Sequence, residues 1–299
     1  MPTSRRQHDG TIRRASLSNA APLALTGDTL QKRDFDRLAA YIYEKAGIRL
    51  VPAKITMIEG RLRRRVRAKG LSSLSDYCSW LFQDDNLDLE NEHLLNAVTT
   101  NKTDFFREPK HFEYLMQHAL PAMRDAGIRR LRVWSAAAST GAEAYTLAML
   151  LDSYAADHGG PDYGILATDL DTEVLRIARR GVFPADMLSP VPPALRARYA
   201  LRASDPKRNE MRIVPELRAA VGFAQLNLMD ARYPVGDPMD IIFCRNVLIY
   251  FDKPTQERVV RRLTDCLRPG GLLFLGHSES ITGFDLPLTA VSNTVFKRV

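Results

Sequence analysis

The sequence predicts an α/β fold in which a mostly parallel sheet, covered by helices on both faces, follows a small all-α bundle. Three observations predict it. From Arg129 onward, short apolar runs alternate with helical patterns, as in βαβ units. Residues 31–98 carry apolar patterns of helical period only. The length of 299 residues exceeds the usual single-domain size, so two unequal domains are expected.

Four helices are expected within residues 31–98. The first ends at Gly47, the second is rich in arginine and ends at Gly70, and Ser72 or Ser73 caps the third. The fourth runs over about 86–98. The apolar stripes of the first three are Phe35, Leu38, Ile42, Ala46; Ile55, Ile58, Leu62, Val66; and Leu74, Tyr77, Cys78, Leu81.

The segment TTNKTDFFRE at 99–108 interrupts the helical pattern, and Pro109 then opens a further helix. Downstream, strands are predicted at 131–134, 164–168, 221–225, 239–244 and 271–275, with a terminal antiparallel piece over 288–299. The longer interval 184–220 contains RYALRA and EMRIVPEL around the polar SDPKRN, which predicts an inserted hairpin.

These patterns divide the chain into four parts. They are a basic, disordered tail over 1–30, a helical domain over 31–100, a linker and junction helix over 101–128, and an α/β domain over 129–299 with a β-subdomain at about 185–220.

Composition excludes several classes of protein. No apolar run approaches the roughly 18 residues of a membrane span, and the segment 20–25 is too short for a signal-peptide core. Three scattered cysteines without C-x-x-C spacing argue against a disulfide framework or a zinc site, so we expect a reduced, cytoplasmic setting. The six histidines also lack ligand spacing; His111 and His118 are expected to be surface or core histidines, and no metal is predicted.

The net charge of +7 and the pI near 9.4 favour an anionic partner, which nucleic acid, a membrane surface or an acidic protein would satisfy. Part of the charge lies in the tail. The other part lies on the second helix, where Glu59 is the only acid nearby in the sequence. We therefore predict an anion-binding face made by Arg61, Arg63, Arg64, Arg65 and Arg67.

Two βα turns indicate a nucleotide-type site. After the first strand, the chain passes through small residues from Ser135 to Gly141 into a helix, and the second strand ends on Asp169. Both features lie at the carboxyl edge of the sheet, where open α/β sheets bind ligands and where a ribose needs a carboxylate acceptor. Because Ala136, Ala137 and Ala138 stand where glycines would make room for a pyrophosphate, S-adenosylmethionine fits better than a dinucleotide.

Six sequence blocks extend this interpretation. They are TTNKTDFFRE at 99–108, WSAAASTGAEAY at 134–145, ATDLDTEVL at 167–175, NL at 227–228, IIFCRNVLIYFD at 241–252 and PGGLLFLGHSES at 269–280. In this order they resemble the CheR-type chemotaxis methyltransferases, which methylate glutamate side chains of bacterial chemoreceptors with S-adenosylmethionine. The resemblance covers residues 31–299. It implies a Rossmann-like class I methyltransferase domain with an inserted small antiparallel β-subdomain, preceded by an all-α domain.

The resemblance also implies roles for individual residues. Cofactor-binding roles fall on Asn101, Thr103, Arg107, Glu143, Asp169, Asn227, Leu228, Asn246 and Val247. Arg107 and Tyr250 would position the substrate glutamate, whose ionised carboxylate needs no general base. Alternatives stay open: Glu143 complements a helix N-terminus, Asp169 caps the next helix, Asn227 makes a turn, and Tyr250 is a buried aromatic.

The implied partner is the acidic helical methylation region of a chemoreceptor, along which the basic helix face would dock. The loop SDPKRN lacks the glycines typical of family members that capture a receptor's C-terminal peptide, which disfavours such docking. Ala142 and Ala144 replace an acid and a proline common in the family, and cofactor binding is still expected. His277, Ser278 and Glu279 are contiguous and cannot converge as a catalytic triad, so a structural or pocket-rim role is expected.

Two other functions are alternatives to glutamate methylation. A nucleic-acid methyltransferase would explain the basicity, but the N/D-P-P-Y/F strand end of amino-methylating enzymes is absent and no nucleic acid is expected as partner. A non-catalytic receptor-binding module is opposed by the presence of Arg107, Asp169, Asn246 and Tyr250.

Overall fold

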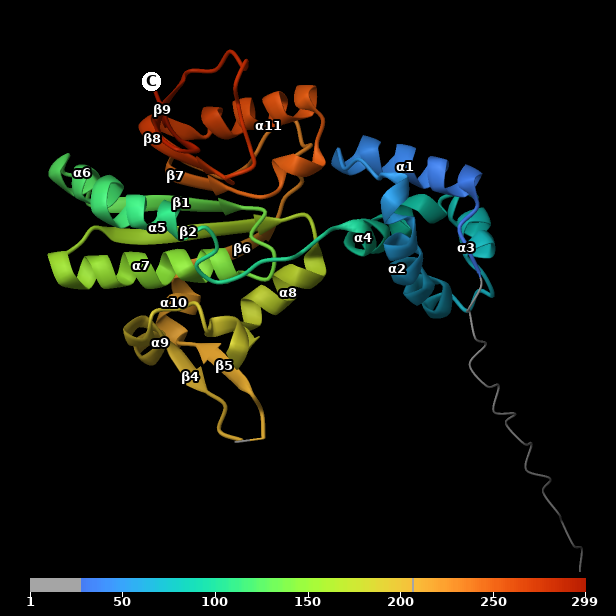
Figure 1. The fold of residues 1–299 in the computed structure, drawn as a ribbon, viewed down its shortest axis with the longest axis horizontal. Helices are drawn as coiled ribbons and strands as arrows, with labels where there is room; N and C mark the ends of the chain where they lie inside the picture. Colours follow the sequence, from blue (N-terminus) through green and yellow to red (C-terminus); the bar gives the residue numbers. More distant parts are fainter. Residues whose placement is uncertain (1–27, 206) are drawn as a thin grey trace, which may run out of the picture.

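The computed structural model describes residues 28–205 and 207–299, in a helical unit beside a larger α/β unit (Figure 1). The predicted basic tail, residues 1–30, lies outside the described residues except for its last three. The predicted fold class is confirmed: an all-α segment precedes a mixed α/β segment built on one large sheet and one small sheet.

The helical unit contains the four predicted helices. They are α1 Lys32–Ala46, α2 Ile55–Ala68, α3 Leu74–Leu81 and α4 Asn86–Val98, with a 3-10 turn Pro52–Lys54 before α2. Gly47 ends α1 in the left-handed conformation that glycine tolerates best, with a φ of 69°. Ser73 caps α3, because its hydroxyl accepts the Asp76 N–H at 3.0 Å. The expected apolar stripes form the core of this unit, with Ile55 only partly buried.

The linker over residues 99–108 leads from the helical unit to a broken helix that packs in the core of the α/β unit. The broken helix runs through α5 Pro109–Tyr114, a π-helical turn Leu115–Ala119 and α6 Leu120–Asp125. Pro121 lacks an N–H and cannot continue the regular helical ladder, and the wider π turn directly precedes it. The apolar spacing predicted the helix from Pro109 and did not predict this interruption.

The large sheet contains seven strands in the order β6-β2-β1-β7-β8-β10-β9. They are β1 Arg130–Ala136, β2 Asp162–Asp169, β6 Val221–Gln225, β7 Met239–Cys244, β8 Leu267–Leu275, β9 Leu288–Ser292 and β10 Val295–Arg298. The first five in spatial order are parallel, and β10 is antiparallel to both neighbours. The order of connection reverses between β1 and β7, and such a switch point is where open sheets bind ligands.

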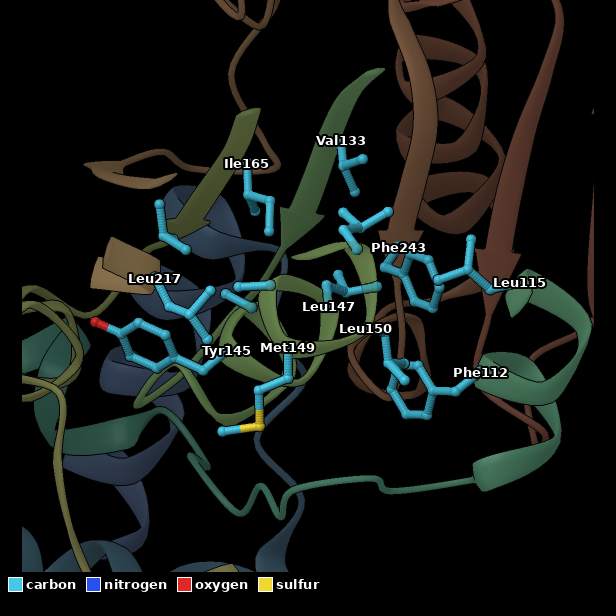
Figure 2. Packing of buried hydrophobic residues seen from close by; sticks show 14 of the residues in the cluster. Phe112, Leu115, Val133, Tyr145, Leu147, Met149, Leu150, Ile165, Leu217 and Phe243 are labelled. Carbon is cyan, nitrogen blue, oxygen red and sulfur yellow. The ribbon is translucent and has the colours of Figure 1, made fainter. Parts of the chain in front are cut away.

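Helices cover both faces of this sheet, as predicted. On one face, Val133, Ile165 and Phe243 from the strands pack on α7 Ala142–His158 and on the junction helix (Figure 2). On the other face, Trp134 and Ile242 belong to a second core that includes residues of α11 Lys253–Asp265. Because neighbouring strand residues enter opposite cores, the sheet is buried on both sides.

The insertion is larger than the predicted hairpin. The hairpin itself is confirmed as β4 Ala200–Arg202 and β5 Glu210–Ile213, paired antiparallel. The structure adds a third strand, β3 Val182–Pro184, which pairs with β5, and two short helices, α9 Pro193–Tyr199 and α10 Pro215–Ala220. Both helices begin at a proline, which suits the first helical position, but neither is long enough to show a helical period in the sequence.

The helix α8 Thr172–Arg180 follows β2 and contacts α4 of the helical unit. Within the part of the chain that the structure describes, no helix is both long and apolar enough to cross a bilayer.

Candidate active site

A cleft opens at the carboxyl ends of β1, β2 and β7, beside the helical unit. All ten residues predicted to bind cofactor or to position substrate line it. They are Asn101, Thr103, Arg107, Glu143, Asp169, Asn227, Leu228, Asn246, Val247 and Tyr250. The fold therefore brings together side chains from the linker, α7, β2 and the loops after β6 and β7.

Asp169 ends β2 with its carboxylate buried at the turn that follows β1. Its Oδ2 accepts the Ser139 N–H at 2.8 Å, and its Oδ1 accepts the Asp171 N–H at 2.9 Å. Burial raises the pKa of Asp169 to about 6. The alternative role of helix cap is wrong for Asp169, because Asp171 caps α8 by accepting the N–H groups of Glu173 and Val174. The Asp169 carboxylate keeps free lone pairs for hydroxyl donors.

The turn after β1 approaches its neighbours closely. Ala137 and Ser139 have positive φ angles of 62° and 51°, and Gly141 has a φ of 90°. A Cβ on Gly141 would lie 3.0 Å from the Cβ of Ala178. Glycine is therefore required where this turn enters α7, as the run of small residues suggested.

Glu143, in the first turn of α7, has its carboxylate in the cleft wall. Its Oε1 accepts the Ser135 hydroxyl at 2.7 Å, and its Oε2 lies 3.5 Å from Nη1 of Arg245. Burial raises the pKa of Glu143 although Arg245 opposes the shift. The position also suits the positive end of the helix, so both assignments of Glu143 are compatible with the structure.

Asn227 makes the turn that was one of its alternatives, since its Oδ1 accepts the Met229 N–H at 2.9 Å. Its Nδ2 donates to the Lys45 carbonyl at 2.6 Å and so ties the loop to the end of α1. Leu226 and Leu228 are buried beside it and give this part of the cleft an apolar lining.

Hydrogen bonds hold the linker in place across the cleft. Asn101 donates from Nδ2 to Asp171 at 2.6 Å, and its carbonyl accepts the Ser139 hydroxyl at 2.9 Å. Arg107 donates from Nη1 to the Lys102 carbonyl at 3.0 Å, and among the described residues it has no carboxylate partner. Thr103 lines the cleft between them.

Tyr250 ends a 3-10 turn, Leu248–Tyr250, and is half-buried. The Lys54 ammonium of the helical unit lies 5.0 Å from the centroid of its ring, and Lys54 also lines the cleft. The Arg49 N–H donates to the Tyr250 carbonyl at 3.1 Å, which joins the two units at this point.

Lys54 was missed from the sequence, although one signal was present. It occupies the position before α2, where side chains that accept the first N–H groups are preferred. A lysine cannot accept them, and its charge is unfavourable at the positive end of a helix.

Arg245 and Glu108 were also missed as parts of this site. Arg245 is buried, with Nη2 lying 3.4 Å from Oε2 of Glu108 and also donating to the Arg107 carbonyl. A charged residue directly after the apolar strand IIFC is the signal in the sequence. The expected structural role in the segment 277–279 is confirmed for Glu279, which accepts four backbone N–H groups.

The fold also gathers three side chains that can ligate metals. One atom each from Glu108, His111 and His277 lies within 4.8 Å of the others, and His111 is buried. Spacing along the sequence did not indicate this group. The Arg245 guanidinium already supplies positive charge beside the Glu108 carboxylate.

Three of the five arginines predicted to form the anion-binding face of α2 already bond to other groups of the protein. Arg61 donates to the carbonyls of Ala97 and Thr99, Arg63 donates to the Asp28 carbonyl at 2.6 Å, and Arg65 donates to Glu90 at 2.6 Å.

Glu59 is the only acid near these arginines in the sequence, but the fold adds Glu90 of α4, which is fully buried against α2. Its Oε2 also lies 2.9 Å from Lys69. Arg64 and Arg67 remain exposed, and neither side chain bonds to a residue that the structure describes.

Two family models match the chain. Residues 101–296 match the CheR methyltransferase SAM binding domain, and residues 33–99 match the CheR methyltransferase all-alpha domain. The chain belongs to the CheR methyltransferase family.

Characterised CheR relatives cover nearly the same length. The chain is 41% identical over 265 residues to chemotaxis protein methyltransferase 2 of Pseudomonas aeruginosa, with 89% of this chain and 92% of the relative covered. It is 42% identical over 270 residues to the chemotaxis protein methyltransferase of Escherichia coli, covering 89% and 91%. It is 39% identical over 288 residues to that of Klebsiella aerogenes, covering 96% and 97%.

This CheR chain is therefore an S-adenosylmethionine-dependent methyltransferase of chemotaxis. The cleft residues fit such a cofactor, which is a cationic nucleoside. Asp169 offers a buried carboxylate acceptor and Glu143 a largely buried one, and Leu226, Leu228 and Val247 offer apolar surface.

Proposed function

We propose that this CheR enzyme methylates glutamate carboxylates of bacterial chemoreceptors, giving glutamate methyl esters and S-adenosylhomocysteine for sensory adaptation. The supporting observation is the polarity of the cleft. Two of its three carboxylates, Asp169 and Glu143, are buried or largely buried in the wall, and the third, Asp104, is exposed. Lys54 and Arg107 are partly exposed and lack carboxylate partners among the described residues. A cationic cofactor suits the buried carboxylates, and an anionic acceptor suits the cations.

On the cofactor side, we assign Asp169 to the ribose hydroxyls and Glu143 to the ammonium group. Asn227 and Leu228 border the adenine, Asn246 and Val247 close the pocket, and Asn101, Thr103 and Arg107 contact the methionine part. The bound cofactor supplies a methyl group on a positively charged sulfur. The structure supports these assignments by placing all nine side chains along one cleft.

On the acceptor side, the enzyme has to orient a carboxylate and exclude water. A glutamate with a pKa of about 4.3 is ionised at neutral pH and needs no base. Orientation of reactants contributes roughly 7–11 kcal/mol in favourable cases. Arg107 holds the carboxylate through charge-assisted hydrogen bonds, and the Tyr250 hydroxyl donates to it. Lys54, beside the Tyr250 ring, adds positive charge at the same place.

For receptor docking, we narrow the basic face to Arg64 and Arg67. The other three predicted arginines, Arg61, Arg63 and Arg65, bond within the protein and contribute mainly to the electrostatic field. An acidic helical methylation region would be steered to this face. Such an acceptor places the enzyme in the cytoplasm. Capture of a receptor's C-terminal peptide stays disfavoured by the loop between β4 and β5, which lacks glycine.

The direct test is incubation with methyl-labelled S-adenosylmethionine and membranes that carry candidate receptors. Carboxyl methyl esters release volatile methanol in alkali, whereas methylated bases, amines and amides do not. We expect volatile label from wild type and its loss in Arg107→Ala and Tyr250→Phe. Arg176→Ala is the matched control, since Arg176 is exposed on α8 and, within the described part of the chain, pairs only with Glu173. Alkali-stable label would contradict the proposal and favour a nucleic-acid substrate.

A further inference from the structure

The loop after β7 is held in place by one carboxylate from the loop after β8. Oε1 of Glu279 accepts the N–H groups of Val247 at 2.8 Å and Leu248 at 2.7 Å. Oε2 accepts those of Asn246 at 3.0 Å and Gly276 at 2.6 Å. Glu279 is only 5% exposed, and its hydrogen bonds with Leu248 and Gly276 are buried, so these two donors have no comparable alternative in water.

The loop after β7 and the loop after β8 are in close contact at Gly276. A Cβ on Gly276 would lie 2.9 Å from the Asn246 nitrogen and 2.9 Å from Oε2 of Glu279. Asn246 itself has a φ of 60°, a conformation that non-glycine residues adopt at a cost. The neighbouring structure must therefore supply the interactions that keep Asn246 in this conformation.

A second carboxylate holds the side chain of the same residue. Nδ2 of Asn246 donates to Oε1 of Glu108 at 3.0 Å, while Oε2 of Glu108 lies 3.4 Å from Arg245. Asn246 is thus fixed through its backbone by Glu279 and through its side chain by Glu108. Tyr250 follows Asn246 in the chain, at the end of the 3-10 turn Leu248–Tyr250.

We propose that Glu279 is a positioning residue for the cofactor, acting through the backbone of Asn246 and Val247. The inference rests on the proposed assignment of those two residues to the cofactor pocket. It does not depend on the identity of the methyl acceptor. Without this carboxylate, the loop loses the acceptors that hold Asn246 in its left-handed conformation, and the cleft wall loses its shape.

Replacement of Glu279 by glutamine tests the carboxylate with little change in volume. Each carboxylate oxygen accepts two N–H groups, one in a buried and one in a partly buried hydrogen bond, so either orientation of the glutamine amide turns an NH2 group toward two N–H donors. We expect Glu279→Gln to weaken S-adenosylhomocysteine binding at least about tenfold in calorimetric titration, because two donors lose a charged acceptor. The thermal midpoint is measured alongside.

Glu59→Gln is the matched control. Glu59 is also 5% exposed, but it lies in α2 outside the cleft, and among the residues that the structure describes it accepts a single N–H, that of Leu30. Its glutamine variant is expected to bind S-adenosylhomocysteine like wild type, whatever it does to the thermal midpoint. A role of Glu279 in stability alone would make the two variants alike in affinity and would overturn the proposal.

A second variant keeps the test decisive if Glu279→Gln does not fold. Gly276→Ala inserts a methyl group between Asn246 and Glu279 and keeps both carboxylates, and we expect it to weaken binding as well. Wild-type affinity in every folded variant would overturn the inference. Asp169→Asn separates a failure of the positioning role from a failure of the pocket assignment. If Asp169→Asn weakens binding and the variants at Glu279 and Gly276 do not, the pocket assignment stands and the positioning role of Glu279 fails. If Asp169→Asn also binds normally, the pocket assignment itself fails.

Discussion

Lys54 of the helical unit and Tyr250 of the α/β unit meet at the cleft, with the ammonium 5.0 Å from the ring centroid. The contact joins two segments that are far apart in sequence. It also places a cation from the helical unit beside the residues that we assign to the acceptor carboxylate. In the proposed function, the helical unit therefore contributes to the active site as well as to receptor docking.

Removal of the Lys54 charge is expected to affect the acceptor and not the cofactor. Lys54→Met should raise the KM for receptor roughly tenfold, because one charge-assisted contact is lost. The affinity for S-adenosylhomocysteine should not change. Lys45→Met is the matched control, since Lys45 lies 5.6 Å from the Tyr41 ring and outside the cleft. A weaker cofactor affinity in Lys54→Met alone would contradict this assignment.

Titration of Asp169 should make the stability of the ligand-free enzyme depend on pH. Its folded-state pKa of about 6 exceeds the ordinary value of 3.8, so its contribution to stability is greatest below 3.8 and falls as the pH rises through 6. Asparagine does not titrate and cannot accept both N–H groups, so the stability of the ligand-free enzyme relative to Asp169→Asn contains a constant part and a pH-dependent part. The pH-dependent part should favour the variant by up to about 3 kcal/mol at pH 8, and by less at pH 5. Urea unfolding of both proteins at the two pH values measures it, and a constant difference would contradict the cause.

Charge reversal at Arg64 and Arg67 tests the docking face. The double variant Arg64→Glu, Arg67→Glu should raise the KM for receptor severalfold, more at low salt than at high salt, because exposed charges are screened. Its cofactor affinity and thermal midpoint should match wild type. The matched control is Arg176→Glu, an exposed reversal on α8. An unchanged KM would exclude this face from docking.

Substitution of Arg65 should change the stability of the protein, whereas charge reversal at Arg64 and Arg67 should change the KM for receptor. Arg65→Ala leaves the fully buried Glu90 with Lys69 as its remaining cation, so we expect a loss of about 1–3 kcal/mol in the free energy of unfolding. The KM for receptor should change little. Denaturant titration and receptor kinetics on the same variant check both parts. Wild-type stability with a raised KM would reverse the assignment.

The sequence predicted features that depend on neighbours along the chain. Gly47 and Ser73 end and begin helices through local backbone chemistry, and the strands β6 and β7 have the predicted bounds because their apolar runs are short and sharply limited. The cleft residues were predictable because they occur in motifs that recur in the family.

Features that depend on distant segments were not predictable. The contact of Glu90 with Arg65 was not predicted, because it forms only when α4 packs against α2. Glu279 and Asn246 belong to separate loops, and their hydrogen bonds exist only because β7 and β8 are neighbours. Lys54 became a cleft residue only through the position of the 3-10 turn that holds Tyr250.

The central claim concerns the atom that receives the methyl group. Tandem mass spectrometry of receptor peptides, after incubation of receptor membranes with enzyme and S-adenosylmethionine, locates that atom directly. We predict methyl esters on glutamate side chains of the helical methylation region, absent when Arg107→Ala replaces the wild-type enzyme. Methylation of lysine, arginine or nucleic acid, with unmodified glutamates, would contradict the account.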